Sequence, residues 1–293
     1  MTTALLTDLV TDDQLDRYAD LIYVRTGIRI SSQKKTLLSN RLRRRLRATG
    51  IENFERYYSH LQKLRADHAE WDAFLQEITT HETYLFRDAN QWEWFSQTFL
   101  TDIQAAARCG ARAKTLRIWS AACSTGDEAC TIACCVADKL LNHREWRVEI
   151  VGTDIGVGAL EQARKQVFGV RAMRLVPPSY RTRFFSRVDQ EHWAAQPTLK
   201  QWLTFRQHNL LEPLQMLPFD LIFVKNVLIY FDGQSKQQVL QTVDRALRPD
   251  GLLVTGPAEG VADLVRDYER LQPWLHRKPT TSVANSVSKG RSK

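Results

Sequence analysis

The stretch "IWSAACSTGDEA", residues 118–129, decides the fold. It continues the apolar run "LRIW" (116–119) into small residues, then one glycine, then two acids. That order is typical of a strand that ends in a ligand-binding turn and is followed by a helix. Because the small side chains leave the backbone of the turn approachable, we expect a binding site here.

Strand-like and helix-like runs alternate on the C-terminal side of this turn. "WRVEIVGTDI" (146–155) is expected to form a strand, and "DEACTIACCVADKLL" (127–141) and "VGALEQARKQVF" (157–168) are expected to form helices. Further strands are expected in 203–209, 219–231 and 251–257, and a further helix in 235–251. This βαβα order predicts a parallel sheet with helices on its faces. Prolines and scattered aromatics at about 168–204 interrupt this pattern and predict an insertion or small subdomain.

The N-terminal third has a different hydrophobic pattern, typical of helices rather than strands. Residues 10–82 show helical spacing of apolar residues, with Thr, Asp and Ser caps and glycine stops, and they predict a small all-helical domain. Residues 83–115 are expected to be a linker and a connecting helix, and residues 116–280 the α/β domain. The polar end, 281–293, is expected to be disordered. The predicted fold class is therefore α/β, a Rossmann-like domain preceded by a helical domain.

Composition limits the class of protein. The 293 residues are 25% charged and 43% hydrophobic, as in ordinary soluble domains. No run approaches the ~20 apolar residues of a membrane span, and the N-terminus lacks a secretory signal, so we expect a cytoplasmic protein. The five cysteines are odd in number and have apolar neighbours, which predicts buried thiols rather than disulfides or a metal site. The net charge of +8 favours an acidic partner: nucleic acid, anionic membrane or an acidic protein surface.

The turn also predicts the kind of cofactor. Asp154 ends the second strand, where a carboxylate can accept hydrogen bonds from ribose hydroxyls. A dinucleotide would require the G-x-G-x-x-G pattern, which is absent, and Asp127 and Glu128 would repel phosphate. The cationic, phosphate-free S-adenosylmethionine suits this loop better than NAD. An ordinary strand–helix turn remains the alternative at this point.

Six motifs follow one another along the chain: "TTHETYLFRD" (79–88), "WSAACSTGDEA" (119–129), "VGTDI" (151–155), "NLLEP" (209–213), "FDLIFVKNVLIYFD" (219–232) and "LRPDGLLVTGPAE" (247–259). From about residue 10 to 275 the chain resembles the CheR family of bacterial chemotaxis methyltransferases. The resemblance implies a helical N-terminal domain and a class I methyltransferase domain with an inserted β-subdomain. It also implies methyl transfer from S-adenosylmethionine to receptor glutamates, with S-adenosylhomocysteine as product and no metal.

The resemblance assigns a set of cofactor-binding residues. They are His81, Thr83, Arg87, Asp127, Asp154, Asn209, Leu210, Asn226 and Val227. Arg87 is also expected at the reaction centre, because a guanidinium can pair with the methionine carboxylate or with the substrate glutamate. A surface ion pair with Asp88 is its alternative role. No general base is needed, since a glutamate with a pKa near ~4.3 is already ionised at neutral pH.

The run "NRLRRRLR" (40–47) is the candidate receptor-binding surface. Leu38, Leu42 and Leu46 form an inward stripe, so Arg43, Arg44 and Arg47 point outward and suit an acidic helical bundle. A solvated face and a phosphate-binding face are the alternatives. We expect a monomer that binds neither nucleic acid nor membrane.

Several residues depart from the usual family pattern. His81 stands where asparagine is usual, Lys225 where arginine is usual, and Pro257 and Asp127 also differ. The inserted subdomain lacks the glycine-rich turn that accompanies docking to a receptor's C-terminal pentapeptide, so substrate binding is expected to be pentapeptide-independent. A non-catalytic S-adenosylmethionine-sensing module and a nucleic-acid methyltransferase remain the alternative functions.

Overall fold

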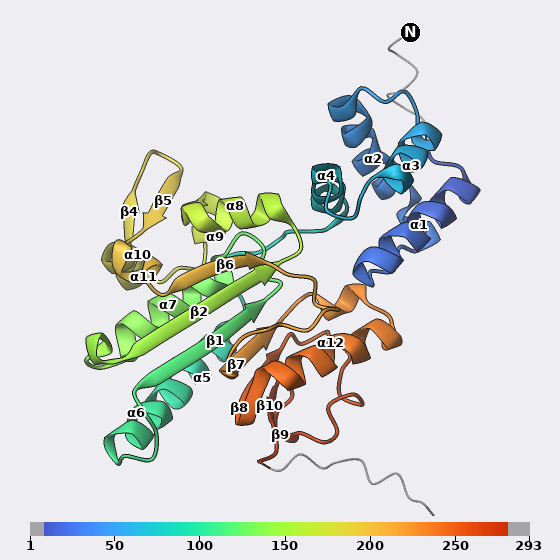
Figure 1. Cartoon of the computed structure of the whole chain (residues 1–293). Helices are drawn as coiled ribbons and strands as arrows, with labels where there is room; N and C mark the ends of the chain where they lie inside the picture. The colour runs from blue at the N-terminus through green and yellow to red at the C-terminus, as the bar shows by residue number, and fades with distance from the viewer. Residues whose placement is uncertain (1–8, 281–293) are drawn as a thin grey trace, which may run out of the picture.

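The chain forms a helical N-terminal part set against one end of a large sheet (Figure 1). The computed structural model describes residues 9–280. The segment 281–293, expected to be disordered, lies outside the described residues. The N-terminal helices are α1 (Asp12–Thr26), α2 (Lys35–Thr49), α3 (Phe54–Lys63) and α4 (Ala69–Ile78), with a short 3-10 turn at Ser32–Lys34 before α2.

Local signals at its two ends determine the extent of α1. Thr11 accepts a hydrogen bond from the backbone of Gln14, whose side chain bonds back to Thr11, and Gly27 ends the helix with φ of 73°. The apolar side chains of α1–α4 meet in a core of their own, which includes the fully buried Tyr18 and Leu42. The amphipathic spacing seen in the sequence therefore forms an independent small core.

Seven strands form the sheet, in the order β6-β2-β1-β7-β8-β10-β9. They are β1 (Thr115–Ala121), β2 (Arg147–Asp154), β6 (Leu203–Gln207), β7 (Phe219–Val224), β8 (Leu247–Thr255), β9 (Glu269–Gln272) and β10 (Leu275–Arg277). Neighbouring strands from β6 to β8 are parallel, and β10 is antiparallel to both β8 and β9. The predicted α/β class is confirmed.

Alternate residues of the strands enter two different cores. Ile118 and Phe223 pack with α5 (Ala89–Trp94), α6 (Leu100–Arg108) and α7 (Asp127–Lys139), the first two joined by a π-helical segment, Phe95–Phe99. Trp119 and Ile222 pack instead with α12 (Gly233–Ala246). Because side chains alternate along a strand, these two cores lie on opposite faces of the sheet. Helix α8 (Val157–Lys165) packs against β2 and β6.

Several element boundaries differ from the sequence expectation, among them the C-terminal ends of two helices. The helix expected over 235–251 ends at Ala246, and β8 begins at Leu247. Pro249 lacks the backbone N–H and disfavours helical geometry at the residue before it, so the helix stops ahead of it. The helix expected over 157–168 ends at Lys165, since Gln166 adopts φ of 52° and β3 starts at Val167.

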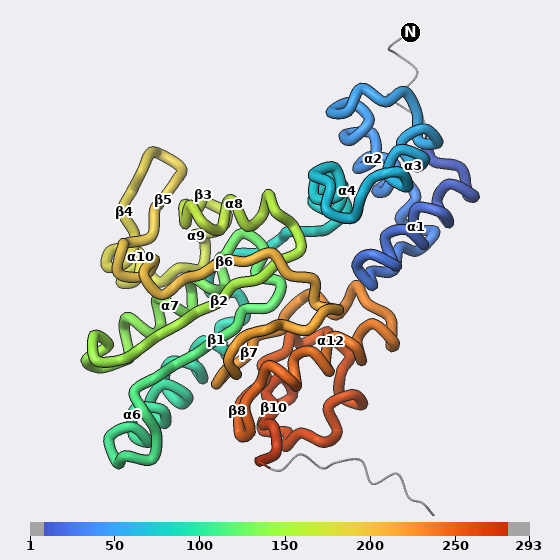
Figure 2. Tube along the Cα trace, in the orientation of Figure 1, coloured from blue at the N-terminus to red at the C-terminus, as the bar shows by residue number. Residues whose placement is uncertain are grey.

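The inserted β-subdomain lies between β2 and β6 in the chain and stands at the β6 side of the sheet (Figure 2). Three antiparallel strands form it, in the order β3-β5-β4: β3 (Val167–Gly169), β4 (Phe185–Arg187) and β5 (His192–Ala195). Short helices surround them: α9 (Val170–Met173), α10 (Pro178–Phe184) and α11 (Pro197–Lys200). The expected small β-subdomain is present.

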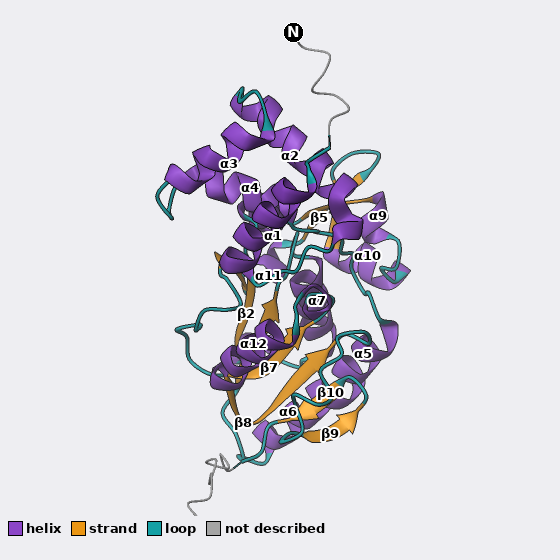
Figure 3. Ribbon diagram, turned by 90° about the vertical axis from the view of Figure 1, so that its right-hand side faces the viewer, coloured by secondary structure: helices purple, strands orange, loops and turns teal. Residues whose placement is uncertain are grey.

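The helical part sits over the carboxyl ends of the parallel strands (Figure 3). Gln76 of α4 lies against the turn after β2, and its Oε1 accepts the backbone N–H of Ala159 at 3.1 Å. Glycine at 156 suits this close approach, because a Cβ there would lie 2.6 Å from both Gln76 Oε1 and His81 Cε1. An isolated bridge joins Ile28 to Phe231 on the other side. Within residues 9–280, no helix combines the length and apolarity needed to cross a membrane.

Candidate functional site

A cavity opens where the carboxyl ends of the parallel strands face the helical part. Its wall combines the ends of β1, β2, β6 and β7 with the linker after α4, with Thr26 of α1, with Ile28 from the segment between α1 and α2, and with Leu38 and Arg41 of α2. Parallel strands place their carboxyl ends along one edge, so side chains far apart in the sequence converge there. The binding site expected at the opening turn is thus a cavity with walls from both parts of the chain.

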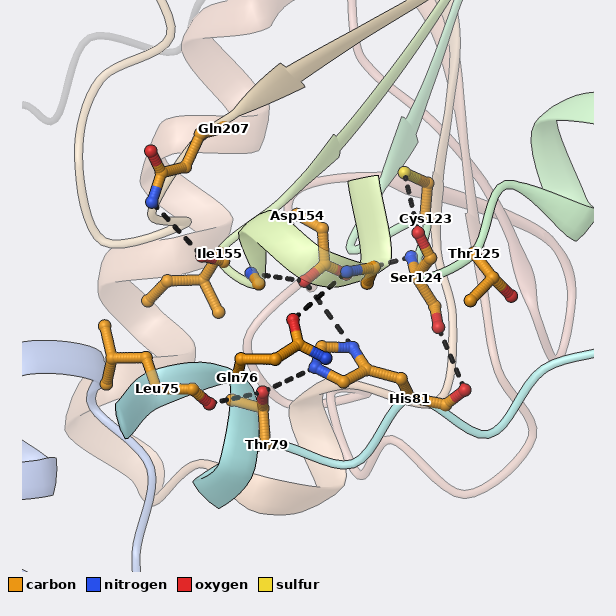
Figure 4. A network of polar contacts seen from close by, with 12 residues as sticks. Leu75, Gln76, Thr79, His81, Cys123, Ser124, Thr125, Asp154, Ile155 and Gln207 are labelled. Carbon is orange, nitrogen blue, oxygen red and sulfur yellow. Dashed lines mark hydrogen bonds and ion pairs between the residues drawn. The ribbon is translucent and has the colours of Figure 1, made fainter. Parts of the chain in front are cut away.

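The turn after β1 is held open by its backbone conformation. Ala122, Ser124 and Gly126 all have positive φ, at 58°, 52° and 84°. The side chain of Asp154 fastens this turn to the next one: its Oδ2 accepts the N–H of Ser124 at 2.9 Å, and its Oδ1 accepts that of Gly156 at 2.8 Å (Figure 4). Asp154 is only 6% exposed, yet it still borders the cavity.

The structure brings most of the expected cofactor residues together. Those that line the cavity are His81, Thr83, Arg87, Asp154, Asn209, Leu210, Asn226 and Val227. Tyr230 lines it as well. They come from the linker after α4, from the last residue of β2, and from the segments that follow β6 and β7.

Asp127 does not border the cavity, whereas its neighbour Glu128 does. The Asp127 side chain is buried, its Oδ2 accepts a bond from the Thr125 hydroxyl at 2.6 Å, and burial raises its pKa to about 6. Consecutive helical residues point about 100° apart, so only one of the two acids at the start of α7 can face the cavity. On the sequence alone, Glu128 is an acid that would repel phosphate, and Asp127 rather than Glu128 is expected among the cofactor-binding residues.

Glu128 belongs to a buried charged cluster that sequence reasoning did not identify. Lys225 Nζ lies 3.0 Å from Asp88 Oδ2 and 3.7 Å from Glu128 Oε2, and Ser120 donates to Glu128 Oε1 at 2.7 Å. Burial raises the pKa of Glu128, and the Lys225 ammonium opposes that rise. The available signal was a lysine directly after the apolar strand "FDLIFV", since a buried cation must find anionic partners.

Asp88 therefore pairs with Lys225, while Arg87 makes a different contact. The Arg87 guanidinium approaches the backbone oxygen of Glu82 at 3.4 Å and lies 5.6 Å from the centre of the Tyr84 ring. Lys225 also donates to the backbone oxygen of Arg87 at 3.3 Å. The backbone of Arg87 is thus fixed by Lys225, and the residue borders the cavity.

Asn209 and Asn226 are both engaged with other parts of the protein. Asn209 Nδ2 donates to the backbone oxygen of Arg25 at 2.9 Å, and its Oδ1 accepts the N–H of Leu211 at 3.1 Å. Asn226, with φ of 59°, has its backbone N–H bonded to the buried carboxylate of Glu259. Glu259 also accepts the N–H of Ile229 at 3.1 Å, so it shapes the loop after β7.

The arginines of α2 lie outside the cavity, apart from Arg41. Arg44 pairs with Glu77 and Arg43 bonds the side chain of Asn40, while Arg47 is exposed. Arg45 is buried against Glu70 at 2.7 Å. Arg41 bonds the backbone oxygen of Ile78 and the Thr80 hydroxyl and borders the cavity. The structure does not bring Arg43, Arg44 and Arg47 to the cavity, so they do not line it with the expected cofactor residues.

The sheet has five neighbouring parallel strands, an antiparallel strand beside them and an acid at the tip of the second strand, which is the arrangement expected of a class I S-adenosylmethionine-dependent methyltransferase. Sequence comparison agrees: residues 81–273 match the family described as "CheR methyltransferase, SAM binding domain", and residues 13–79 match "CheR methyltransferase, all-alpha domain". The chain belongs to the CheR methyltransferase family.

Three similar curated proteins bear the name "Chemotaxis protein methyltransferase". The protein of Salmonella typhimurium is 35% identical over 265 residues, and that of Escherichia coli is 34% identical over 264 residues. In both comparisons the match covers 88% of this chain and 88% of the relative. The protein of Borreliella burgdorferi is 27% identical, with 92% of this chain and 95% of the relative covered.

Proposed function

We propose that this protein transfers the methyl group of S-adenosylmethionine to glutamate side chains of methyl-accepting chemotaxis receptors and so forms glutamate methyl esters. The observation that carries the proposal is the two-part match to the CheR methyltransferase family, together with a cavity that combines Asp154, Glu128 and Arg87. We further propose that it acts in the cytoplasm as a monomer and does not bind nucleic acid.

The charges around the cavity suit the three parts of the cofactor. We assign Asp154 to the ribose hydroxyls, Glu128 to the ammonium group and Arg87 to the carboxylate. Leu210 and Val227 offer apolar contacts for the adenine, and the amide of Asn209 helps to hold that wall in place. The acids of the β1–α7 turn also disfavour a phosphate-bearing ligand.

The chemistry requires little beyond positioning. The cofactor supplies an activated methyl group, which a carboxylate oxygen attacks in line while the carbon–sulfur bond breaks and its electron pair stays on sulfur. Because a glutamate is ionised at neutral pH, the protein needs no base and contributes orientation and exclusion of water. The walls from α1 and α2 provide that enclosure.

The direct test uses S-adenosylmethionine with a labelled methyl group and the signalling fragment of a chemotaxis receptor. Base-labile label on receptor glutamates would support the proposal. Cofactor binding without transfer to any receptor would indicate a sensing module instead. Base-stable label transferred to RNA or DNA would indicate a nucleic-acid methyltransferase.

Substituting Arg87 by alanine is expected to lower kcat/KM for receptor methylation about 50-fold, because a forked guanidinium–carboxylate contact is lost. Arg87→Lys should recover part of the loss, since a lysine keeps the charge without the fork. Arg174→Ala is the matched control: this arginine also lies over Tyr84, at 3.6 Å, but does not border the cavity. Equal rates for Arg87→Ala and Arg174→Ala would contradict the assignment.

The proposed receptor surface consists of Arg43, Arg44 and Arg47 on α2. Changing Arg43 and Arg47 together to glutamate is expected to lower kcat/KM for the receptor about tenfold, through slower association, and to leave S-adenosylhomocysteine affinity unchanged. The control, Arg108→Glu with Arg147→Glu, makes the same change in net charge at exposed positions away from α2. A similar loss in the control would mean that net charge, rather than this surface, drives association.

We also propose that receptor binding does not require a C-terminal pentapeptide. The loop between β4 and β5 is closed by Asp189, which accepts the backbone N–H groups of Glu191 and His192 at 2.8 Å. Titration of a receptor-tail peptide should give no heat of binding at concentrations up to about 100 μM. Low-micromolar binding would overturn this proposal.

A further inference from the structure

His81 occupies an unusual position beside the carboxylate that we assign to the ribose. Its ring lies between the end of α4 and the tip of β2 and borders the cavity (Figure 4). Nε2 lies 2.7 Å from Thr79 Oγ1, and Nδ1 lies 3.8 Å from Asp154 Oδ1. The ring therefore presents one nitrogen to the protein and the other toward Asp154.

The contacts of Thr79 determine which nitrogen carries the proton. The Thr79 hydroxyl donates its single hydrogen to the backbone oxygen of Leu75 at 2.7 Å. Its oxygen can then only accept from His81, so Nε2 must be the donor of that contact. The neutral ring is left with an unprotonated Nδ1, which is an acceptor.

Two hydrogen-bond acceptors thus face each other across a gap. The two carboxylate oxygens of Asp154 already accept the backbone N–H groups of Ser124 and Gly156. His81 Nδ1, a further acceptor, lies 3.8 Å from Asp154 Oδ1. Since neither His81 Nδ1 nor Asp154 Oδ1 can donate to the other, a ligand that supplies hydrogen-bond donors can bind to both. The adjacent hydroxyls of a ribose are donors of this kind, and each can donate one hydrogen bond.

We propose that His81 Nδ1 accepts a hydrogen bond from a ribose hydroxyl of the cofactor beside Asp154, so that binding requires the neutral ring and is coupled to proton release. This inference rests on the proposed function, because it takes the ligand to be S-adenosylmethionine or its product. It deepens that function by naming a second ribose acceptor at a position where the family usually has asparagine.

Protonation would change the role of the ring. With a hydrogen on Nδ1, His81 becomes a donor to Asp154 and competes with the ribose for that carboxylate. The charged groups that face the ring are Asp154 from the end of β2 and Arg41 from α2; Gln76 and Thr79 face it from α4 and its end. Burial lowers the pKa of His81 and so favours the neutral ring; Asp154 opposes this effect and Arg41 reinforces it.

The affinity for the cofactor is therefore expected to decrease at low pH. Cofactor binds the neutral form, so its affinity is full above the pKa of the free protein's ring and falls as the pH drops through that value. Since a single proton is involved, the dissociation constant is expected to rise by up to about tenfold for each further pH unit.

The test is calorimetric titration of S-adenosylhomocysteine from about pH 8 to about pH 5, with wild type, His81→Asn and His81→Ala. Wild type should lose affinity on acidification more steeply than His81→Asn, in which the buried acids Asp127 and Glu128 still titrate but the ring is gone. For wild type, removing one ribose hydroxyl (2′-deoxy or 3′-deoxy ligand) should weaken binding about fivefold more than it does for His81→Ala. Nitrogen-15 spectra should show Nε2 protonated and Nδ1 bare at neutral pH.

The outcomes separate the two proposals. If His81→Asn shows the same fall in affinity on acidification as wild type, or if Nδ1 carries the proton at neutral pH, the inference about His81 is overturned while the proposed function stands. If wild type binds no S-adenosylhomocysteine at any pH, the proposed function fails, and this inference with it. Thermal unfolding of each variant at each pH identifies any affinity loss that comes from unfolding.

Discussion

Substituting Asp154 by alanine is expected to weaken S-adenosylhomocysteine binding by about 1000-fold. Two ribose hydroxyls donating to one carboxylate are each worth about 1.5–3 kcal/mol, because hydrogen bonds to a charged acceptor are stronger than neutral ones. The substitution also releases the N–H groups of Ser124 and Gly156, which Asp154 accepts at 2.9 and 2.8 Å. The loss of affinity therefore combines lost ligand contacts with a looser turn.

Titration calorimetry measures this effect, with Asp267→Ala as the control at an exposed acid away from the cavity. Circular dichroism and thermal unfolding establish that the Asp154→Ala chain is folded, which we expect because Cys123 N still bonds Thr153 O at 2.8 Å. A folded Asp154→Ala protein that binds the product within tenfold of wild type would remove Asp154 from the cofactor site.

Replacing Lys225 by methionine is expected to destabilise the fold by about 3–5 kcal/mol, the cost of leaving a buried charge without its partner. Lys225 is only 7% exposed and lies within 3.0 Å of Asp88 and 3.7 Å of Glu128. Methionine fills a similar volume, so the loss comes from electrostatics rather than from a cavity. The midpoint temperature of thermal unfolding should fall by about 10 °C.

Lys225→Arg is the matched control, since arginine is usual in the family at this position and keeps the positive charge. The midpoint temperature of its thermal unfolding should stay within a few degrees of the wild-type value. The prediction would be contradicted if the methionine variant unfolded at the wild-type temperature, because Asp88 and Glu128 would then tolerate burial without the ammonium.

Local patterns predicted the elements that depend on local physics. Thr11 and Gly27 bound α1, and the alternation of Ile118 with Trp119 assigns side chains to the two faces of a strand. The antiparallel pair β9 and β10 was missed, because both strands are short and largely polar and pair only at the edge of a completed sheet.

The candidate site was harder to predict where contacts cross the chain. The bond from Asn209 to the backbone of Arg25 joins residues 184 positions apart, and no local pattern encodes it. The choice between Asp127 and Glu128 depends on the rotation of α7 about its axis, which packing against the sheet determines. Lys225 was noted as a departure from the family, but its partners Asp88 and Glu128 come from two other segments.

The docking of α1–α4 over the strand ends has a thermodynamic consequence. Since Thr26, Ile28 and Arg41 form part of the wall of the proposed cofactor cavity, we expect the affinity for the cofactor to depend on how firmly the helical part packs against the strand ends. Linkage is reciprocal, so an occupied cavity must hold the two parts together more tightly by the same free energy. A receptor that binds to α2 would then change the affinity for the cofactor as well as the position of the substrate glutamate. Exchanging the helical part between relatives to alter receptor choice would also retune the exchange of product for fresh cofactor.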